Sequence, residues 1–289
     1  MHMAHRLIAS LLLLMALLGP GGSALAQSDE LLEIDTGRTM KVDDNVVPVV
    51  HRAILTLPAT PTDTALLFFR GDPGYMLIRS LNDKYPNMHW LAKNESDYLR
   101  AGIALVLVDC PTDQWGANRR PPATKCLFDY RSSTQHADDV RRILKRLKDD
   151  HGILRPYILG HSLGTVSSRW LSINLGKDEV AGIIHSATIN SYAPAIYWLI
   201  GNLMRTFPAN ASGAPMLFVH HERDACPSTP HFMARNQAKD NLVTVRGGLP
   251  QGDVCGGQHY HSYGGREEAA NKAIIAWIKD HRVEAFVGE

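Results

Sequence analysis

The pentapeptide Gly160-His161-Ser162-Leu163-Gly164 has the form G-x-S-x-G. The apolar residues 157–159 before it predict a short strand, and residues 163–175 after it predict a helix that Gly176 ends. A serine between a strand and a helix sits in a sharp turn that raises its hydroxyl above the edge of the sheet, and the flanking glycines keep side chains out of that turn. The pattern therefore predicts that Ser162 is a nucleophile.

A serine hydroxyl is a weak nucleophile unless a histidine takes its proton and a carboxylate orients that histidine. The apolar residues 216–219 predict a strand that runs into His220-His221-Glu222-Arg223-Asp224. A carboxylate just past the carboxyl end of such a strand lies where ligands bind in open α/β sheets. This position favours Asp224 as the acid, with Glu222 and Asp253 as alternatives.

Two histidines precede the amphipathic residues 267–279, which predict the last helix. His261 leads directly into that helix and is the favoured base. His259 is the alternative.

Hydrolysis of an acyl group also needs N–H donors for the negative oxygen that develops on the carbonyl. The backbone N–H of Leu163, the residue after the nucleophile, is one expected donor. The second is expected in the loop Arg70-Gly71-Asp72-Pro73-Gly74, which follows the apolar residues 65–69. Proline has no N–H, so Asp72 is the expected donor through its backbone.

The elements that must position these residues alternate between strands and helices. Apolar runs predict eight strands, at residues 46–50, 53–57, 65–69, 103–108, 157–159, 180–184, 216–219 and 242–245. Helices are predicted at residues 90–100, 137–147, 163–175 and 267–279, whereas residues 28–45 predict a polar arm and residues 111–132 a long loop. The alternation favours one α/β domain with a mostly parallel sheet covered by helices on both faces.

With these residues in place, the chain resembles the α/β-hydrolase family over residues 46–282. The resemblance rests on the G-x-S-x-G segment, the glycine loop at residues 70–74, Asp224 after a late strand and His261 before the final helix. It implies an eight-stranded, mostly parallel sheet and hydrolysis through an acyl-enzyme, without a metal or an organic cofactor. Two features depart from the family: Arg70-Gly71 stands where many members have His-Gly, and the insert at about residues 187–215 is short, which implies a minimal lid.

Four cysteines remain after the first 26 residues, and four cysteines allow three pairings. Cys226 follows the expected acid by two residues, and Cys255 precedes the expected base by six. A Cys226–Cys255 bond would join the two catalytic loops, and Cys110–Cys126 would then close the long loop after residues 103–108.

Residues 1–26 have the layout of a secretory signal peptide, with Arg6, an apolar run at residues 7–18 and the small-x-small sequence Ala24-Leu25-Ala26. A run of twelve apolar residues is too short to span a bilayer, so we expect cleavage after Ala26 and a mature domain of residues 27–289. The expected location is secreted or periplasmic. Disulfide bonds persist in such oxidising compartments.

The charge balance, 30 Lys and Arg against 29 Asp and Glu, disfavours a nucleic-acid partner and a polybasic membrane anchor. The sequence thus predicts a secreted serine hydrolase that cleaves a carboxylic ester, with peptidase or thioesterase activity as alternatives on the same triad. Two readings of other classes are a non-catalytic binding protein and a metal-dependent protein. The latter would use His220, His221, Asp224, His259 and His261.

Overall fold

The computed structural model describes residues 27–71, 73–115, 126, 128–190 and 213–289. The expected signal peptide, Asp72 and most of the expected lid insert lie outside the described residues. Within the described chain no helix has the length and apolar character needed to cross a membrane.

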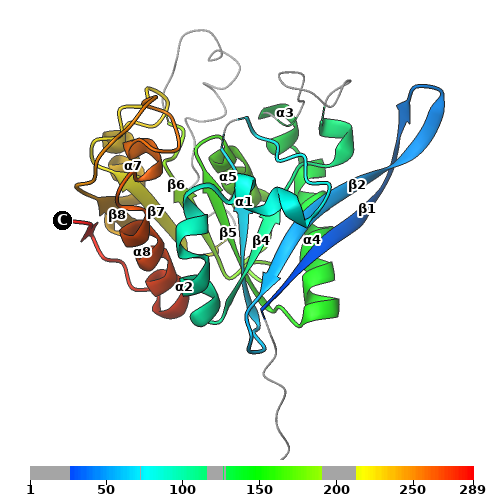
Figure 1. Ribbon diagram of the computed structural model, residues 1–289, viewed down its shortest axis with the longest axis horizontal. Coiled ribbons are helices and arrows are strands. Elements are labelled where there is room, and N and C mark those ends of the chain that lie inside the picture. Colours follow the sequence, from blue (N-terminus) through cyan, green and yellow to red (C-terminus); the bar gives the residue numbers. More distant parts are fainter. Residues whose placement is uncertain (1–26, 72, 116–125, 127, 191–212) are drawn as a thin grey trace, which may run out of the picture.

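A nine-stranded sheet forms the centre of the described chain, in the order β1-β2-β4-β3-β5-β6-β7-β8-β9 (Figure 1). β1 and β2 pair antiparallel, as do β2 and β4, and the other pairs are parallel. The mostly parallel α/β sheet is therefore confirmed. The strands are β1 (Ser28–Val42), β2 (Asn45–Leu57), β3 (Thr64–Phe69), β4 (Ile103–Val108), β5 (Arg155–His161), β6 (Gly182–Ser186), β7 (Met216–His221), β8 (Leu242–Val245) and β9 (Phe286–Val287).

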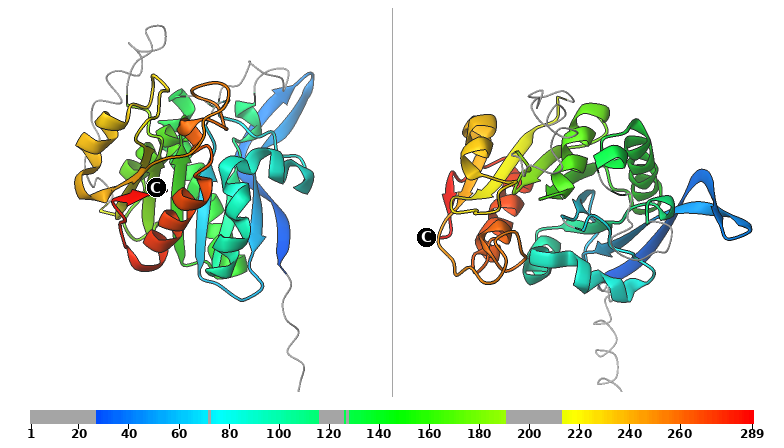
Figure 2. Two further views of the ribbon diagram at one scale, coloured as in Figure 1. Left: turned by 60° about the vertical axis from the view of Figure 1, so that its left-hand side comes forward. Right: turned by 90° about the horizontal axis from the view of Figure 1, so that it is seen from above.

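The prediction of a polar arm at residues 28–45 is wrong, because most of that segment is β1. Leu32, Ile34 and Thr36 are buried, while the intervening Glu33 and Asp35 are exposed. This alternation is that of a strand with one solvated face. The two strands predicted at residues 46–57 form one continuous strand, β2, and the far end of the β1–β2 hairpin projects from the body (Figures 1 and 2).

Helices cover both faces of the sheet, as predicted (Figure 2). Apolar residues of α4, α5 and α7 pack with one face, and those of α1, α2 and α8 with the other. The α-helices are α1 (Lys84–Met88), α2 (Glu95–Arg100), α3 (Phe128–Arg131), α4 (Thr134–His151), α5 (Gly164–Asn174), α7 (His231–Ala238) and α8 (Glu267–Asp280). The 3-10 turns are η1 (Leu81–Asp83), η2 (His89–Asn94), η3 (Thr112–Gln114), η4 (Lys239–Asn241) and η5 (Tyr260–Ser262).

The long helix α4 shows how the sequence sets the element ends. The Ser133 side chain accepts a hydrogen bond from the His136 amide, which caps the first turn, and Gly152 ends the helix in a left-handed conformation. In contrast, the helix predicted at residues 90–100 divides into η2 and α2, so the expected continuous helix is wrong. The expected long loop at residues 111–132 contains η3 and α3.

Candidate active site

Ser162 occupies a strained turn between β5 and α5. Its φ is +53°, a left-handed conformation that is uncommon for a residue with a side chain. A Cβ on Gly160 would lie 2.4 Å from the Gly164 carbonyl oxygen, and a Cβ on Gly164 would lie 1.9 Å from the Phe69 carbonyl oxygen. Neither position accepts a side chain, which is the physical reason for both glycines of the motif.

Asp224 and His261 form a buried hydrogen-bonded pair. Asp224 follows β7, His261 lies in η5, and His261 Nδ1 is 3.0 Å from Asp224 Oδ2. Their side chains are 0% and 2% exposed, respectively. Burial opposes ionisation of the carboxyl group, but the hydrogen bond and charge of His261 outweigh it, so the pKa of Asp224 lies below its ordinary value.

Two further hydrogen bonds hold the carboxylate of Asp224. The Thr229 hydroxyl donates to Asp224 Oδ2 over 2.7 Å and lies 3.1 Å from His261 Nδ1. The Cys226 amide donates to Asp224 Oδ1 over 3.0 Å. Sequence reasoning did not identify Thr229, since a threonine five residues after the acid belongs to no pattern.

The His261 ring lies beside His161, the residue that precedes Ser162, with ring centroids 5.3 Å apart. Because Nδ1 binds Asp224 and no described residue takes Nε2 as a hydrogen-bond partner, Nε2 is the nitrogen left for a serine hydroxyl or a substrate. The pair Asp224–His261 and the elbow at Ser162 therefore converge at the carboxyl ends of β5 and β7.

The alternative acids and base make other contacts. Glu222 is paired with Arg246, with 3.1 Å between Oε2 and Nε, and Asp253 accepts a hydrogen bond from the Cys255 amide over 2.7 Å. His259 precedes η5, and its ring packs against Tyr260. Of the candidate acids and bases, Asp224 and His261 are the two whose side chains form a hydrogen bond to each other.

The loop after β3 lies directly against Ser162. A Cβ on Gly71 would be 2.9 Å from Ser162 Cβ and 3.5 Å from Ser162 Oγ. A Cβ on Gly74 would be 3.0 Å from Leu163 Cδ2. Leu163 comes directly before α5, while Asp72, the other expected N–H donor, lies outside the described residues.

A row of buried polar side chains includes His161, the residue before Ser162. His161 Nδ1 and Nε2 lie 2.9 and 3.2 Å from the hydroxyls of Ser186 and Ser262, respectively. The Tyr263 hydroxyl contacts Ser186 and donates to the Val219 carbonyl oxygen over 2.9 Å. Burial lowers the pKa of His161 well below its ordinary value, so this imidazole stays neutral. Its two ring nitrogens link the hydroxyl groups of Ser186 and Ser262.

Both expected disulfides are present in the structure. Cys226 and Cys255 have Cα atoms 4.7 Å apart, and Cys110 and Cys126 have Cα atoms 6.1 Å apart. The first bond joins the segment that carries Asp224 to the loop that leads to His261. Each bond thus fixes a loop at the carboxyl edge of the sheet.

No protein-family model matches this chain. No curated protein sequence matches it either. Solved structures do match it. Est1E from Butyrivibrio proteoclasticus is 13% identical over 84% of this chain and 96% of its own, with a TM-score of 0.52. A dienelactone hydrolase from Anabaena variabilis is 15% identical, and the match covers 88% of this chain and 99% of that protein, with a TM-score of 0.51. A lidless α/β serine hydrolase from Xanthomonas campestris is 14% identical, and the match covers 83% of this chain and 92% of that protein, with a TM-score of 0.48.

The chain has the α/β-hydrolase fold. The eight strands β1 to β8 make up its sheet, and the two-residue β9 extends the edge beside β8. At identities of 15% or less these structural neighbours show the fold alone. Any chemical activity has to be argued from the residues of the site.

The histidines near the site do not converge on a common centre in this α/β-hydrolase fold. His220 Nε2 accepts a hydrogen bond from the Thr188 amide, and His221 Nε2 lies 2.8 Å from the Gly247 carbonyl oxygen. No group of three metal-binding side chains occurs among the described residues. His220 and His221 therefore bind the backbone of neighbouring segments, at Thr188 and Gly247 respectively.

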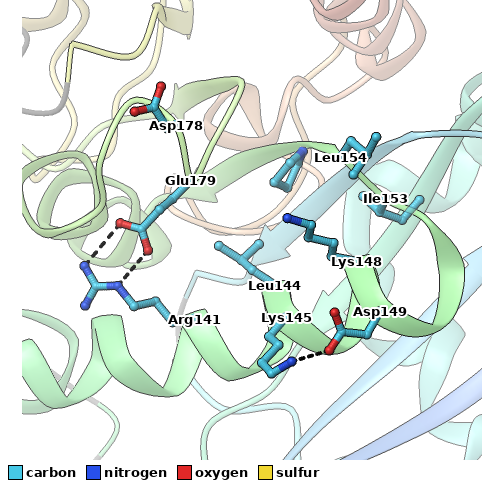
Figure 3. Close-up of a pocket in the computed structure, with 10 residues that line it drawn as sticks. Arg141, Leu144, Lys145, Lys148, Asp149, Ile153, Leu154, Asp178 and Glu179 are labelled. Atoms are coloured by element: carbon cyan, nitrogen blue, oxygen red, sulfur yellow. Dashed lines mark hydrogen bonds and ion pairs between the residues drawn. The ribbon is translucent and has the colours of Figure 1, made fainter.

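A hollow of about 480 Å³ lies elsewhere in the fold. Figure 3 shows its lining residues, which come from α4, from the segment that enters β5 and from Asp178 and Glu179 before β6. Leu144, Lys148 and Leu154 are among its lining residues. It lies at the amino end of β5, whereas Ser162 follows the carboxyl end, roughly 20 Å away along the strand. This hollow is therefore separate from the candidate active site.

Proposed function

We propose that this protein is a secreted serine hydrolase that cleaves a carboxylic ester through an acyl-enzyme intermediate. The observation that carries the proposal is the buried Asp224–His261 pair, whose histidine ring lies 5.3 Å from that of His161, the residue before a serine in a strained, glycine-flanked turn. Strained backbone of this kind is concentrated at functional sites. The chain order serine, acid, histidine is the order used on this fold.

In the proposed reaction, Ser162 Oγ attacks the ester carbonyl carbon while His261 Nε2 takes its proton. The carbonyl π electrons move to the oxygen, and the N–H groups of Leu163 and Asp72 receive the resulting charge. Collapse of this intermediate breaks the bond to the alcohol oxygen, which takes the proton from His261. A water molecule, deprotonated by His261, then attacks the acyl carbon and releases a carboxylic acid and the free serine.

Asp224 orients the His261 ring and stabilises its protonated form during both steps. Its own hydrogen bonds to Thr229 and to the Cys226 amide keep the carboxylate fixed and ionised. Esters are the proposed substrates because they need no dedicated site for an amine or a coenzyme. One of the fold neighbours is a dienelactone hydrolase, and since lactones are cyclic esters, a lactone belongs in the substrate panel.

Export is part of the proposal, and it is supported by the two disulfides. N-terminal sequencing of the exported protein is expected to begin at Gln27. Retention of residues 1–26 in the exported form would contradict a cleaved signal peptide.

The proposal is tested by fluorophosphonate labelling of the purified, oxidised protein. The wild type should be labelled, and Ser162→Ala and His261→Ala should not, whereas His259→Ala should be labelled like the wild type. Asp224→Asn should reduce kcat by about 10³- to 10⁴-fold, and Glu222→Gln should leave it unchanged. A panel of ester, lactone, thioester and peptide substrates then identifies the bond cleaved. A folded wild-type protein that takes no label would overturn the proposal.

A further inference from the structure

The loop after β3 is held by two buried charged side chains from other parts of the chain. We call residues 70–78 the oxyanion loop, since the proposed function assigns one N–H donor to it. Asp109 follows β4 and Arg131 ends α3, and each residue is 3% exposed. Neither belongs to the triad.

Asp109 binds the oxyanion loop through its amides. Asp109 Oδ1 accepts a hydrogen bond from the Met76 amide over 2.7 Å, and Oδ2 accepts one from the Ile78 amide over 2.7 Å. The Cys110 amide also donates to Oδ1 over 2.7 Å. Burial raises the pKa of Asp109, whereas these amides favour its charged form.

Arg131 binds the same loop through a carbonyl group. Its Nη2 donates to the Gly74 carbonyl oxygen, its Nε to the Cys126 carbonyl oxygen over 3.2 Å, and its Nη1 to the Ser167 hydroxyl over 2.6 Å. Among the described residues no carboxylate lies within ion-pair distance of Arg131, although the charge of Asp109 favours the protonated guanidinium. Burial lowers the pKa of Arg131 to about 10, so the guanidinium is still charged at neutral pH.

Burial of a charged group outside an ion pair is unfavourable, and an apolar side chain would fill the same space without that penalty. What the guanidinium supplies instead is a rigid fork that joins three segments. Ser167 lies on α5, the helix that begins beside Leu163, and Gly74 lies in the oxyanion loop. Arg131 therefore connects the two segments that carry the proposed N–H donors.

The contacts between these segments and the nucleophile are short. The Gly74 amide donates to the Gly71 carbonyl oxygen over 2.8 Å, which closes a turn. Gly71 lies against Ser162, and Gly74 lies against Leu163. A shift of the Gly74 carbonyl group would thus move the turn that faces Ser162 Oγ.

We propose that Asp109 and Arg131 are positioning residues that fix the oxyanion loop against α5 and thereby determine how well the site stabilises the transition state. This inference rests on the proposed function. It goes beyond the triad because it concerns the charge that develops on the substrate oxygen, rather than the activation of the serine.

The test compares Arg131→Lys and Asp109→Asn with two matched controls, Arg38→Lys and Glu95→Gln. Lysine keeps the charge of Arg131 but loses the fork, and asparagine keeps the shape of Asp109 but presents a donor to an amide. The controls make the same changes in ion pairs that do not contact the oxyanion loop. We expect kcat to fall about 10- to 100-fold in both test variants with KM nearly unchanged, and both parameters to stay at wild-type values in the controls.

The deciding measurement is inhibition by a trifluoromethyl ketone and by the matching methyl ketone. Serine attack converts the trifluoromethyl ketone into an adduct with a negative oxygen, whereas the methyl ketone binds without such an adduct. The Ki of the trifluoromethyl ketone should rise in step with the loss of kcat/KM, and the Ki of the methyl ketone should stay within about twofold. Thermal unfolding of each variant establishes that it is folded.

Equal effects on both ketones, or wild-type kcat in folded Arg131→Lys and Asp109→Asn, would overturn the inference while leaving the proposed function intact. A wild-type protein without fluorophosphonate labelling would overturn the proposed function, and the inference with it. Because the two substitutions act on separate residues, a failure of one variant to fold leaves the other as the test.

Discussion

The Thr229 hydroxyl donates to Asp224 Oδ2 over 2.7 Å, the same oxygen that lies 3.0 Å from His261 Nδ1. Thr229 is fully buried. One carboxylate oxygen therefore receives both hydrogen bonds, and the threonine limits the directions in which the histidine ring can turn.

Thr229→Val should reduce kcat about tenfold, because it removes a hydrogen bond to a charged group that is worth about 1.5 kcal/mol. Thr229→Ser keeps the hydroxyl and should retain most of the activity. Steady-state kinetics on the best ester substrate provides the measurement. Equal activity in the valine and serine variants would show that the Thr229 hydroxyl does not orient the pair.

Gly164→Ala should abolish activity and destabilise the fold by about 3 kcal/mol or more, because its Cβ would lie 1.9 Å from the Phe69 carbonyl oxygen. Gly176→Ala is the matched control, since its Cβ would approach nothing closer than 3.5 Å. Urea unfolding of both variants measures the difference. A Gly164→Ala protein as stable as Gly176→Ala would contradict the crowded turn.

The two disulfides should differ in their effect on catalysis rather than on stability. Their sequence separations are 29 and 16 residues, so replacing either pair by serine should cost about 3–4 kcal/mol in the free energy of unfolding. The Cys226→Ser/Cys255→Ser variant should also disturb the Asp224–His261 pair, because the backbone N–H of Cys226 donates a hydrogen bond to Asp224 Oδ1. It should therefore have a lower kcat toward a small activated ester than the Cys110→Ser/Cys126→Ser variant.

Peptide mapping under non-reducing conditions accompanies that comparison. The expected linked peptides contain Cys226 with Cys255 and Cys110 with Cys126. Any other linkage in the wild type would remove the basis for assigning the kinetic difference to the catalytic loops.

Stability should fall in mild acid because several histidines are buried in neutral form. Burial lowers the pKa of each of them, and for His220 the value falls from 6.5 to about 3. The folded chain then binds fewer protons than the unfolded chain, so the free energy of unfolding decreases as the pH drops below 6.5 and continues to decrease toward the folded pKa. The group consists of His136, His161, His185 and His220.

For His220 alone the loss between pH 6.5 and pH 5 is about 2 kcal/mol. Urea unfolding at pH 7.5, 6 and 5 measures the slope. His136→Leu should flatten it, since neither ring nitrogen of His136 has a hydrogen-bond partner in the described chain, whereas the exposed His281→Asn should not. A slope that does not change in His136→Leu would assign the acid sensitivity to other groups.

The sequence was informative where residue type and spacing are dictated by geometry. The Gly160–Ser162–Gly164 spacing follows from backbone contacts that no side chain allows, and Asp224 and His261 stand at element ends that hydrophobic periodicity locates. The structure also has the two expected disulfides, whose positions follow from the loops they join.

The sequence was uninformative where a residue acts through contacts made by the fold. Asp109 and Arg131 belong to no motif, because their importance comes from a loop that approaches them only after the strands pair. β1 was missed because the acidic residues on its solvated face hide the alternation of Leu32 and Ile34. The break between η2 and α2 was also missed, because residues 89–100 contain no glycine or proline that would predict it.

The left-handed backbone at Ser162 has a consequence for how the protein responds to mutation. Glycine adopts this conformation at little cost, whereas a residue with a Cβ pays roughly 1 kcal/mol or more. Ser162→Gly should therefore unfold at a higher urea concentration than the wild type while having no hydrolytic activity. A screen that selects only for protein abundance or thermal stability would therefore enrich inactive variants at position 162. A screen meant to keep a serine there has to select for catalytic turnover directly.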